Sequence, residues 1–297
     1  MSQEITARVA AIASQLLTDK KVKLVIGYAR PDSSRGAVPF FARTPEEAKK
    51  LVFDDTCHHN LVVYLTRTFQ YIKDAPVAIT VKGCDVKAIN VLLSENQVKR
   101  SDVWVIGLPC SGVRLYGTDG GATGKKILDF RCERCEVQTP KFFDQMAGEL
   151  PAGSPPPKAE DYADVADFDK KTNEEKFDSW SHDLERCVKC YACRAVCPLC
   201  YCERCVVDKN RPQWVKTSAH ALGNFEWHVT RAMHLAGRCV GCGACETACH
   251  QQIPLMLLNR KLACHLQEAY GYRAGLSAEE PPALASWKPD DKQEFIG

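Results

Sequence analysis

Hydrophobic positions in the first half of the chain follow helical and strand patterns in alternation. Apolar residues recur at helical spacing over residues 3–18 and again over residues 85–95. Short apolar runs predict strands at residues 22–28, 61–65, 76–81 and 103–107. Strands that alternate with helices are typical of an α/β domain with a largely parallel sheet, which we place at residues 1–150.

The second half begins with a change of composition. Residues 151–178 are rich in proline and acidic residues, which predicts a linker that is extended unless it lies on a partner surface. A second, smaller domain is predicted at residues 179–270, and a tail at residues 271–297. Within that domain, residues 219–236 have the apolar spacing of a helix.

Overall charge and hydropathy exclude some classes of partner. The formal net charge is +2, so no overall charge draws the chain to nucleic acid or to an anionic membrane. No run of about 18 or more apolar residues is present, so no membrane span is predicted. The first residues contain Glu4 and Arg8 within their apolar pattern and do not resemble a signal peptide. We therefore expect a cytoplasmic protein.

Cysteine content changes the picture, because the chain has 17 cysteines. Disulfides are rare in a reducing cytoplasm, where cysteines at repeated short spacings are more often metal ligands. Eight of them form two runs with the spacing C-x2-C-x2-C-x3-C. The first run is Cys187, Cys190, Cys193 and Cys197, and the second is Cys239, Cys242, Cys245 and Cys249. This is the spacing of bacterial ferredoxins that hold two [4Fe–4S] clusters.

The spacing also predicts which thiolates share a cluster. Three cysteines separated by two residues can hold three corners of one cubane, whereas the fourth reaches the other cluster. The predicted ligands of cluster 1 are Cys187, Cys190, Cys193 and Cys249, and those of cluster 2 are Cys239, Cys242, Cys245 and Cys197. We therefore expect a small α+β ferredoxin-like domain with a helical insertion between the runs. The alternative is a pair of zinc sites.

Further cysteines suggest more metal sites. Cys84 and Cys110 follow two predicted strands, and Cys132 and Cys135 form a C-x2-C pair, so these four are a candidate third site that favours [4Fe–4S] over zinc. A weaker candidate consists of Cys200, Cys202 and Cys205. These three would belong to a fourth cluster, or would join Cys132 and Cys135 in a zinc ribbon.

The motifs resemble two known families. The cysteine runs look like a bacterial dicluster ferredoxin domain over residues 179–266. Residues 20–145, through AITVKGCD, VWVIGLPCSGV and RCERC, are similar to the beta subunits of deazaflavin-reducing hydrogenases and formate dehydrogenases. The resemblance implies electron transfer between FAD, iron–sulfur clusters and a partner subunit, in some members within heterodisulfide-reductase-like assemblies. It also places extra cysteines at Cys84, Cys110, Cys132 and Cys135.

One departure from the second family concerns the flavin. Where that family often has a glycine pair that opens a helix, this chain has the sequence Cys57-His58-His59-Asn60. Bulky side chains there oppose the close backbone approach that a phosphate or a flavin ring needs. FAD therefore stays a candidate cofactor with a sequence feature against it.

Together these patterns predict an iron–sulfur electron-transfer subunit of a cytoplasmic multi-subunit oxidoreductase. Its partners would be flavin- or metal-containing subunits, and the catalytic chemistry would lie in one of them, so we assign no catalytic residue to this chain. One alternative is a dehydrogenase or hydrogenase beta subunit with its own FAD. Another is a zinc-stabilised interaction module.

Overall fold

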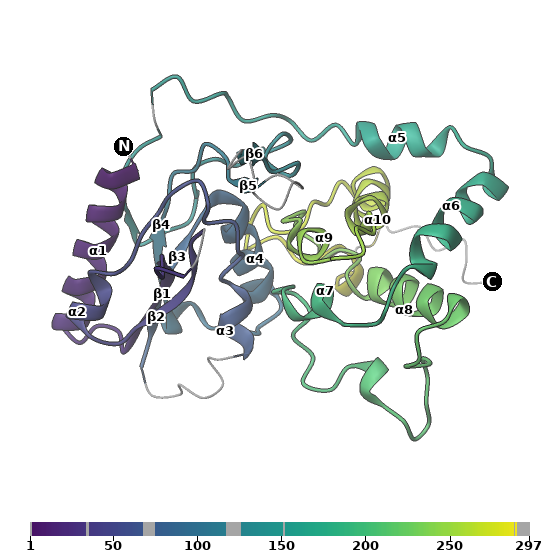
Figure 1. Cartoon of the computed structure of the whole chain (residues 1–297), viewed down its shortest axis with the longest axis horizontal. Helices are drawn as coiled ribbons and strands as arrows, with labels where there is room; N and C mark the ends of the chain where they lie inside the picture. The colour runs from purple at the N-terminus through teal and green to yellow at the C-terminus, as the bar shows by residue number, and fades with distance from the viewer. Residues whose placement is uncertain are drawn as a thin grey trace.

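The computed structural model describes residues 2–33, 36–67, 75–116, 126–150, 152–287 and 289. An α/β half comes first along the chain, and a helical half follows it (Figure 1). The predicted tail at residues 271–297 is described as far as residue 287 and at residue 289.

The α/β half is built on a five-stranded sheet with the order β2-β1-β3-β4-β7. The strands are β1 (Leu24–Ala29), β2 (Val38–Ala42), β3 (Val77–Val81), β4 (Val103–Gly107) and β7 (Gln145–Met146). Strands β1, β3, β4 and β7 are parallel, and β2 pairs with β1 in the antiparallel direction. The prediction of an α/β domain with a largely parallel sheet is confirmed.

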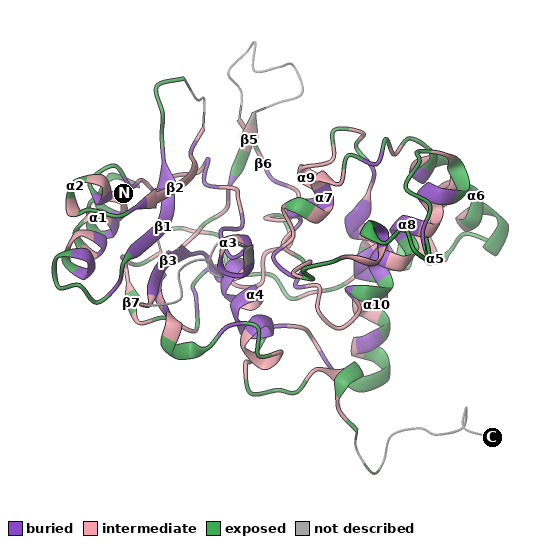
Figure 2. Cartoon of the chain, turned by 90° about the horizontal axis from the view of Figure 1, so that it is seen from below, coloured by how far each residue is buried: buried purple, intermediate pink, exposed green. Residues whose placement is uncertain are grey.

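Helices lie on both faces of this sheet. On one side are α1 (Ser2–Thr18) and α2 (Pro45–Ala48), and on the other are α3 (Val63–Arg67) and α4 (Gly83–Ser94) (Figure 1). Every residue of β1 and β3 is buried (Figure 2). Such strands are continuous apolar runs because both of their faces are covered, which explains why their sequences do not alternate.

The strand predicted at residues 61–65 is wrong. The chain makes a turn there and then forms helix α3, and the side chain of Asn60 accepts a hydrogen bond from the backbone N–H of Val62 at 3.1 Å. Leu61 and Leu65 are fully buried. A short buried apolar run has no periodicity that separates a strand from a helical turn, which is the physical reason for the error.

A small hairpin lies outside the main sheet. It pairs β5 (Arg114–Tyr116) with β6 (Lys126–Leu128) in the antiparallel direction. Short 3₁₀ helices occur at η2 (Arg100–Asp102), η3 (Val206–Asp208) and η4 (Ala283–Ala285).

The cysteine-rich half consists of helices and turns. The helices are α5 (Ala163–Asp169), α6 (Asn173–Glu185), α7 (Ala192–Ala195), α8 (Ala221–His234), α9 (Ala244–Thr247) and α10 (Leu255–Tyr270). Helix α8 confirms the helix predicted at residues 219–236. No strand is present in residues 152–287, so the β part of the predicted α+β composition is not found there.

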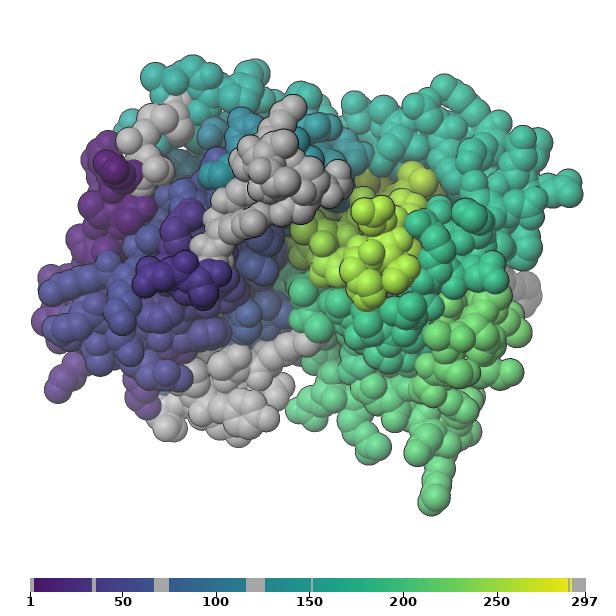
Figure 3. All heavy atoms as spheres, in the orientation of Figure 1, coloured from purple at the N-terminus to yellow at the C-terminus, as the bar shows by residue number. Residues whose placement is uncertain are grey.

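The proline-rich segment forms a strap over this half. It crosses the molecule from the α/β half and then forms α5 and the start of α6 (Figure 3). Arg260 of α10 pairs with Glu160 and with Asp164, each at 2.8 Å. Lys261 pairs with Asp169 at 2.6 Å. The acidic composition that suggested an extended linker is thus used to hold the segment against basic residues of α10.

A second connection joins the C-terminal segment to the α/β half. The side-chain amide of Asn90 in α4 donates a hydrogen bond of 2.9 Å to the carbonyl of Gly275. Gly275 has a φ of +78°, and a Cβ atom there would lie 2.2 Å from the carbonyl oxygen of Lys87. Only glycine allows this close approach of two backbones.

We predict that Gly275→Ala lowers the free energy of unfolding by about 1–3 kcal/mol, because the new methyl group would force the two backbones apart. Gly271→Ala is the matched control, since Gly271 also has positive φ, +64°, but no atom lies within 4 Å of its Cβ position. Urea unfolding of both variants under anaerobic conditions measures the difference. An equal loss in the two variants would contradict this packing of the C-terminal segment on α4.

Candidate metal centres

The two cysteine runs have the same local backbone geometry. Two and four residues after the first cysteine of each run, the backbone is left-handed: at Lys189 and Tyr191 in the first run, and at Gly241 and Gly243 in the second. The second of these left-handed residues is the N-cap of a four-residue helix: Tyr191 caps α7 in the first run, and Gly243 caps α9 in the second. The internal repeat seen in the sequence is therefore also a repeat of conformation.

The thiols of the second group lie around one cavity. Cys197, Cys239, Cys242 and Cys245 all line a space of about 330 Å³, together with Arg231 and Met256. Burial raises the pKa of Cys239 to about 11 and also raises the pKa of Cys245. The fourth cysteine of the first run thus lies among the first three of the second run.

The thiols of the first group also interact with one another. Burial raises the pKa of Cys187, and the neighbouring thiols of Cys249 and Cys190 raise it further. Burial also raises the pKa of Cys193. The cation of Arg231 opposes this rise, and the thiols of Cys187 and Cys249 add to it. Cys187 and Cys193 of the first run therefore lie near Cys249, the fourth cysteine of the second run.

A third group of cysteines lines a cavity of about 820 Å³. Strands β3 and β4 are parallel, with Val81 opposite Gly107, so Cys84 and Cys110 leave the sheet at the same edge. The pair Cys132 and Cys135 completes the lining. The thiols of Cys132 and Cys135 add to burial in raising the pKa of Cys110 to about 11.

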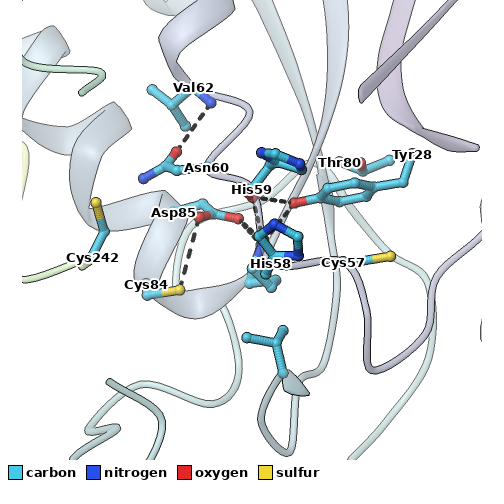
Figure 4. A network of polar contacts seen from close by, with 12 residues as sticks. Tyr28, Cys57, His58, His59, Asn60, Val62, Thr80, Cys84, Asp85 and Cys242 are labelled. Atoms are coloured by element: carbon cyan, nitrogen blue, oxygen red, sulfur yellow. Dashed lines mark hydrogen bonds and ion pairs between the residues drawn. The ribbon is translucent and has the colours of Figure 1, made fainter. Parts of the chain in front are cut away.

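A buried cation lies beside this third group. Lys82 forms an ion pair of 2.7 Å with Asp85, and its amine also donates to the hydroxyl of Tyr28 at 2.6 Å and to the carbonyl of His59 at 3.0 Å. Figure 4 labels these three partners together with Cys84. Burial disfavours the charge, but Asp85 and Tyr28 outweigh it and hold the pKa of Lys82 well above its usual value. Burial raises the pKa of Cys84 well above its usual value, and the Lys82 cation opposes this rise only in part.

Arg131 joins the second and third groups. Its guanidinium donates to the carbonyl of Cys242 at 2.7 Å and to the carbonyl of His58 at 2.9 Å, and it pairs with the fully buried Asp129 at 2.8 Å. Cys242 also lines the cavity of the third group. The second and third groups of cysteines are therefore neighbours. Arg131, which is next to Cys132 of the third group, is hydrogen-bonded to the loop that carries Cys242 of the second.

The three cysteines of the weaker candidate site, Cys200, Cys202 and Cys205, have partly different neighbours. Cys200 interacts with the thiol of Cys197 and with Arg231. Cys202 is exposed and lies close to Arg238 and Tyr201. Cys205 lies near Arg194 and Tyr191. Arg194 lies near both Cys200 and Cys205, and Cys200 and Cys202 line one cavity, so the site expected from these three cysteines stays a prediction.

A further cavity lies beside residues 58–60, in the segment where the beta-subunit family often has a glycine pair. It has a volume of about 970 Å³ and is lined by His58, His59, Tyr64 and Arg131 from one half and by Ala244 from the other. The centroids of the two imidazoles lie 4.2 Å apart, and the ring planes are tilted by 33°. Burial lowers the pKa of His59 to about 4, so this imidazole is neutral at pH 7.

In the described part of the chain, no three His, Cys, Asp or Glu side chains converge closely enough to bind a single metal ion. A [4Fe–4S] cluster carries one thiolate on each of four irons, so its ligands are spaced around a cube and not around one ion. Cavities lined by four thiols fit that donor set. Among the same residues, no helix combines the length and hydropathy of a membrane span.

The buried cations are the site residues that sequence reasoning missed. Arg231 meets Cys193 and Cys197 only through the tertiary fold. Arg131 likewise meets Cys84 and Cys242 only through the tertiary fold. Lys82 and Arg131 are close in sequence to Cys84 and Cys132, which is the one signal that could have identified them.

Known proteins similar to this chain were found among curated sequences and solved structures, and no protein-family model matches it. The beta subunit of the F420-dependent formate dehydrogenase of Methanocaldococcus jannaschii is 24% identical, over 94% of this chain and 94% of the relative. The beta subunit of F420-dependent formate dehydrogenase 1 of Methanococcus maripaludis is 24% identical, over 96% and 95%.

A chain in the xenon-derivatised F420-reducing [NiFe] hydrogenase complex of Methanosarcina barkeri matches 42% of this chain and 46% of its own length. It is 17% identical with a TM-score of 0.34, which is too weak to define the fold. The two formate dehydrogenase subunits carry the assignment, because each aligns with nearly the whole of this chain. The similarity inferred from the N-terminal half is confirmed: over nearly its whole length the chain is similar to the beta subunits of two F420-dependent formate dehydrogenases.

Proposed function

We propose that this chain is an iron–sulfur electron-transfer subunit of a cytoplasmic, multi-subunit oxidoreductase of the F420-dependent type. It would consist of an α/β domain at residues 1–150 and a dicluster ferredoxin-like domain at residues 179–270, joined by the strap at residues 151–178. The relatives support a role within a complex, since both are named as beta subunits of a dehydrogenase. The catalytic bond-making would take place in a partner subunit.

The observation that carries this proposal is the grouping of twelve thiols into three sets of four. In the proposal, cluster 1 is held by Cys187, Cys190, Cys193 and Cys249, cluster 2 by Cys239, Cys242, Cys245 and Cys197, and cluster 3 by Cys84, Cys110, Cys132 and Cys135. The cavities around the second and third sets support it. Metal binding would deprotonate thiols whose pKa values are raised by burial.

The three sets follow one another through the protein. Set 1 adjoins set 2, because Arg231 lies close to Cys193 of one and to Cys245 of the other. Set 2 adjoins set 3, because Cys242 and Cys84 line the same cavity. When bound, the clusters would supply one-electron carriers. The residues of this chain would hold them in sequence, exclude water and provide the cations that offset their negative charge.

Iron and sulfide analysis of anaerobically purified protein tests the proposal. We expect about twelve iron atoms per chain, since each [4Fe–4S] cluster holds four, and an equal amount of acid-labile sulfide. Zinc without sulfide would contradict the proposal and would favour a zinc-stabilised interaction module.

The assignment of the third cluster has its own test. Cys132→Ala should remove about four iron atoms per chain and leave about eight, because one thiolate corner is lost. Cys264→Ala is the matched control, since Cys264 lies on α10 and its thiol interacts with Glu268 at 3.3 Å, outside all three sets. Unchanged iron in the Cys132 variant would show that this set holds no cluster.

A second candidate function is that the chain carries its own flavin. The cavity beside His58 and His59 favours it, because its volume without open solvent, about 400 Å³, is in the range of cofactor sites. It lies next to Ala244, two residues after Cys242 of the proposed cluster 2. The bulky imidazoles remain the feature against a bound isoalloxazine ring.

Absorbance after acid release decides between these candidates. If the chain carries FAD, the supernatant of acid-precipitated protein should contain about one flavin per chain, and His59→Trp should reduce it by filling the cavity. Tyr201→Trp serves as the control for an added ring elsewhere, since Tyr201 lines a different cavity. A flavin-free supernatant from the unaltered protein would exclude this second candidate.

A further inference from the structure

Helix α8 lies in the insertion between the two cysteine runs, and its buried face carries polar residues beside Trp227 and Ala232. Asn224, His228 and Arg231 are spaced by four and three residues, so they form one stripe along the helix. All three are buried, with exposed fractions of 1%, 3% and 4%. A buried polar stripe is costly unless it meets polar partners, which raises the question of what this stripe faces.

The two ends of the stripe contact the first cysteine run. The side-chain amide of Asn224 donates to the carbonyl of Cys187 at 2.7 Å and to the carbonyl of Glu185 at 3.2 Å. The guanidinium of Arg231 donates to the carbonyl of Cys193 at 3.2 Å. These bonds fix α8 against the loop that carries the first group of thiols.

Arg231 is a buried cation without a carboxylate partner. Among the ion pairs of the described residues, none involves Arg231, whereas the buried Lys82, Arg131 and Arg260 each pair with a carboxylate. Its Nε–H is buried and has no hydrogen-bond acceptor. A buried charge in this state is strongly unfavourable unless an anion compensates it.

The neighbours of Arg231 are thiols. Burial opposes its charge, but Cys245, Cys197, Cys200 and Cys193 outweigh that effect and keep its pKa well above the usual value. Arg231 also lines the cavity that is surrounded by the second set of cysteines. The missing anion would therefore lie in that cavity.

We propose that Arg231 is the counter-charge of cluster 2, that its Nε–H donates a hydrogen bond to a sulfur of that cluster, and that it thereby raises the reduction potential. The inference rests on the proposed function, and it assigns a role in setting the cluster potential to the helical insertion. A cation and an N–H donor both stabilise the more negative, reduced state of a cluster. Arginine keeps its charge at every physiological pH.

Redox titration of the complete, cluster-loaded chain, followed by EPR, tests this role. In Arg231→Met the midpoint of one cluster should fall by at least about 59 mV, which corresponds to a tenfold change in a one-electron equilibrium. Arg231→Lys keeps the charge but loses the fork of donors, so its shift should have the same sign and be smaller.

Lys261→Met is the matched control, because it removes the same charge from an exposed position on α10. Water and salt screen that charge, so the midpoints should stay unchanged. Full iron content with identical midpoints in the Arg231→Met variant would overturn the role of Arg231 and leave the proposed function intact. An iron-free parent protein would overturn the proposed function itself.

A second measurement needs no variant, in case Arg231→Met does not assemble its clusters. In parent protein labelled with ¹⁵N-arginine, pulsed EPR of the reduced clusters should detect hyperfine coupling to a guanidinium nitrogen. The same coupling should be lost in Arg231→Lys. If the labelled parent protein shows no coupling, the hydrogen bond to the cluster does not exist.

Discussion

The burial of negative charge is the constraint that governs this structure. Twelve cysteine thiols lie in three groups at the contact between an α/β half and a helical half, and burial raises the pKa of thiols in every group. A thiolate is stable there only when a metal holds it and a cation offsets its charge. Lys82, Arg131 and Arg231 are such cations, and each is nearly or fully buried beside cysteines. Their placement explains why two dissimilar halves share one core.

Each half supplies its thiols by a different structural device. In the α/β half, two parallel strands end at the same edge, and the residues that follow them carry Cys84 and Cys110 to one cavity. In the helical half, a repeated loop with two left-handed residues leads into a short helix, which contains the third cysteine of each run and ends before the fourth. The strap over α10 and the contact of Gly275 with α4 then tie the halves together. The result is a row of sites with Arg231 and Arg131 between successive groups.

Local patterns predicted much of this arrangement, and the tertiary fold decided the remainder. The helix at the N-terminus, α4 and α8 follow from helical periodicity, and β3 and β4 follow from short apolar runs. The segment at residues 61–65 is a helical turn and not the predicted strand, because its buried apolar residues show neither a helical nor a strand period. Strand β2, whose residues are mostly only partly buried, was not predicted. The cysteine spacing predicts ligand sets for the thiols of the two runs, and these sets stay a prediction. It could not predict Arg231, which lies 34 residues after Cys197 and reaches the thiols only because α8 folds back over them.

The most direct test of this account is to locate the iron. Anomalous diffraction from crystals grown without oxygen, measured at the iron absorption edge, should show three separate peaks, one within each set of four cysteines. The peak of the second set should lie beside the Nε atom of Arg231. Anomalous peaks that come from zinc instead of iron would contradict the account. So would the absence of an iron peak between Cys197 and the second cysteine run.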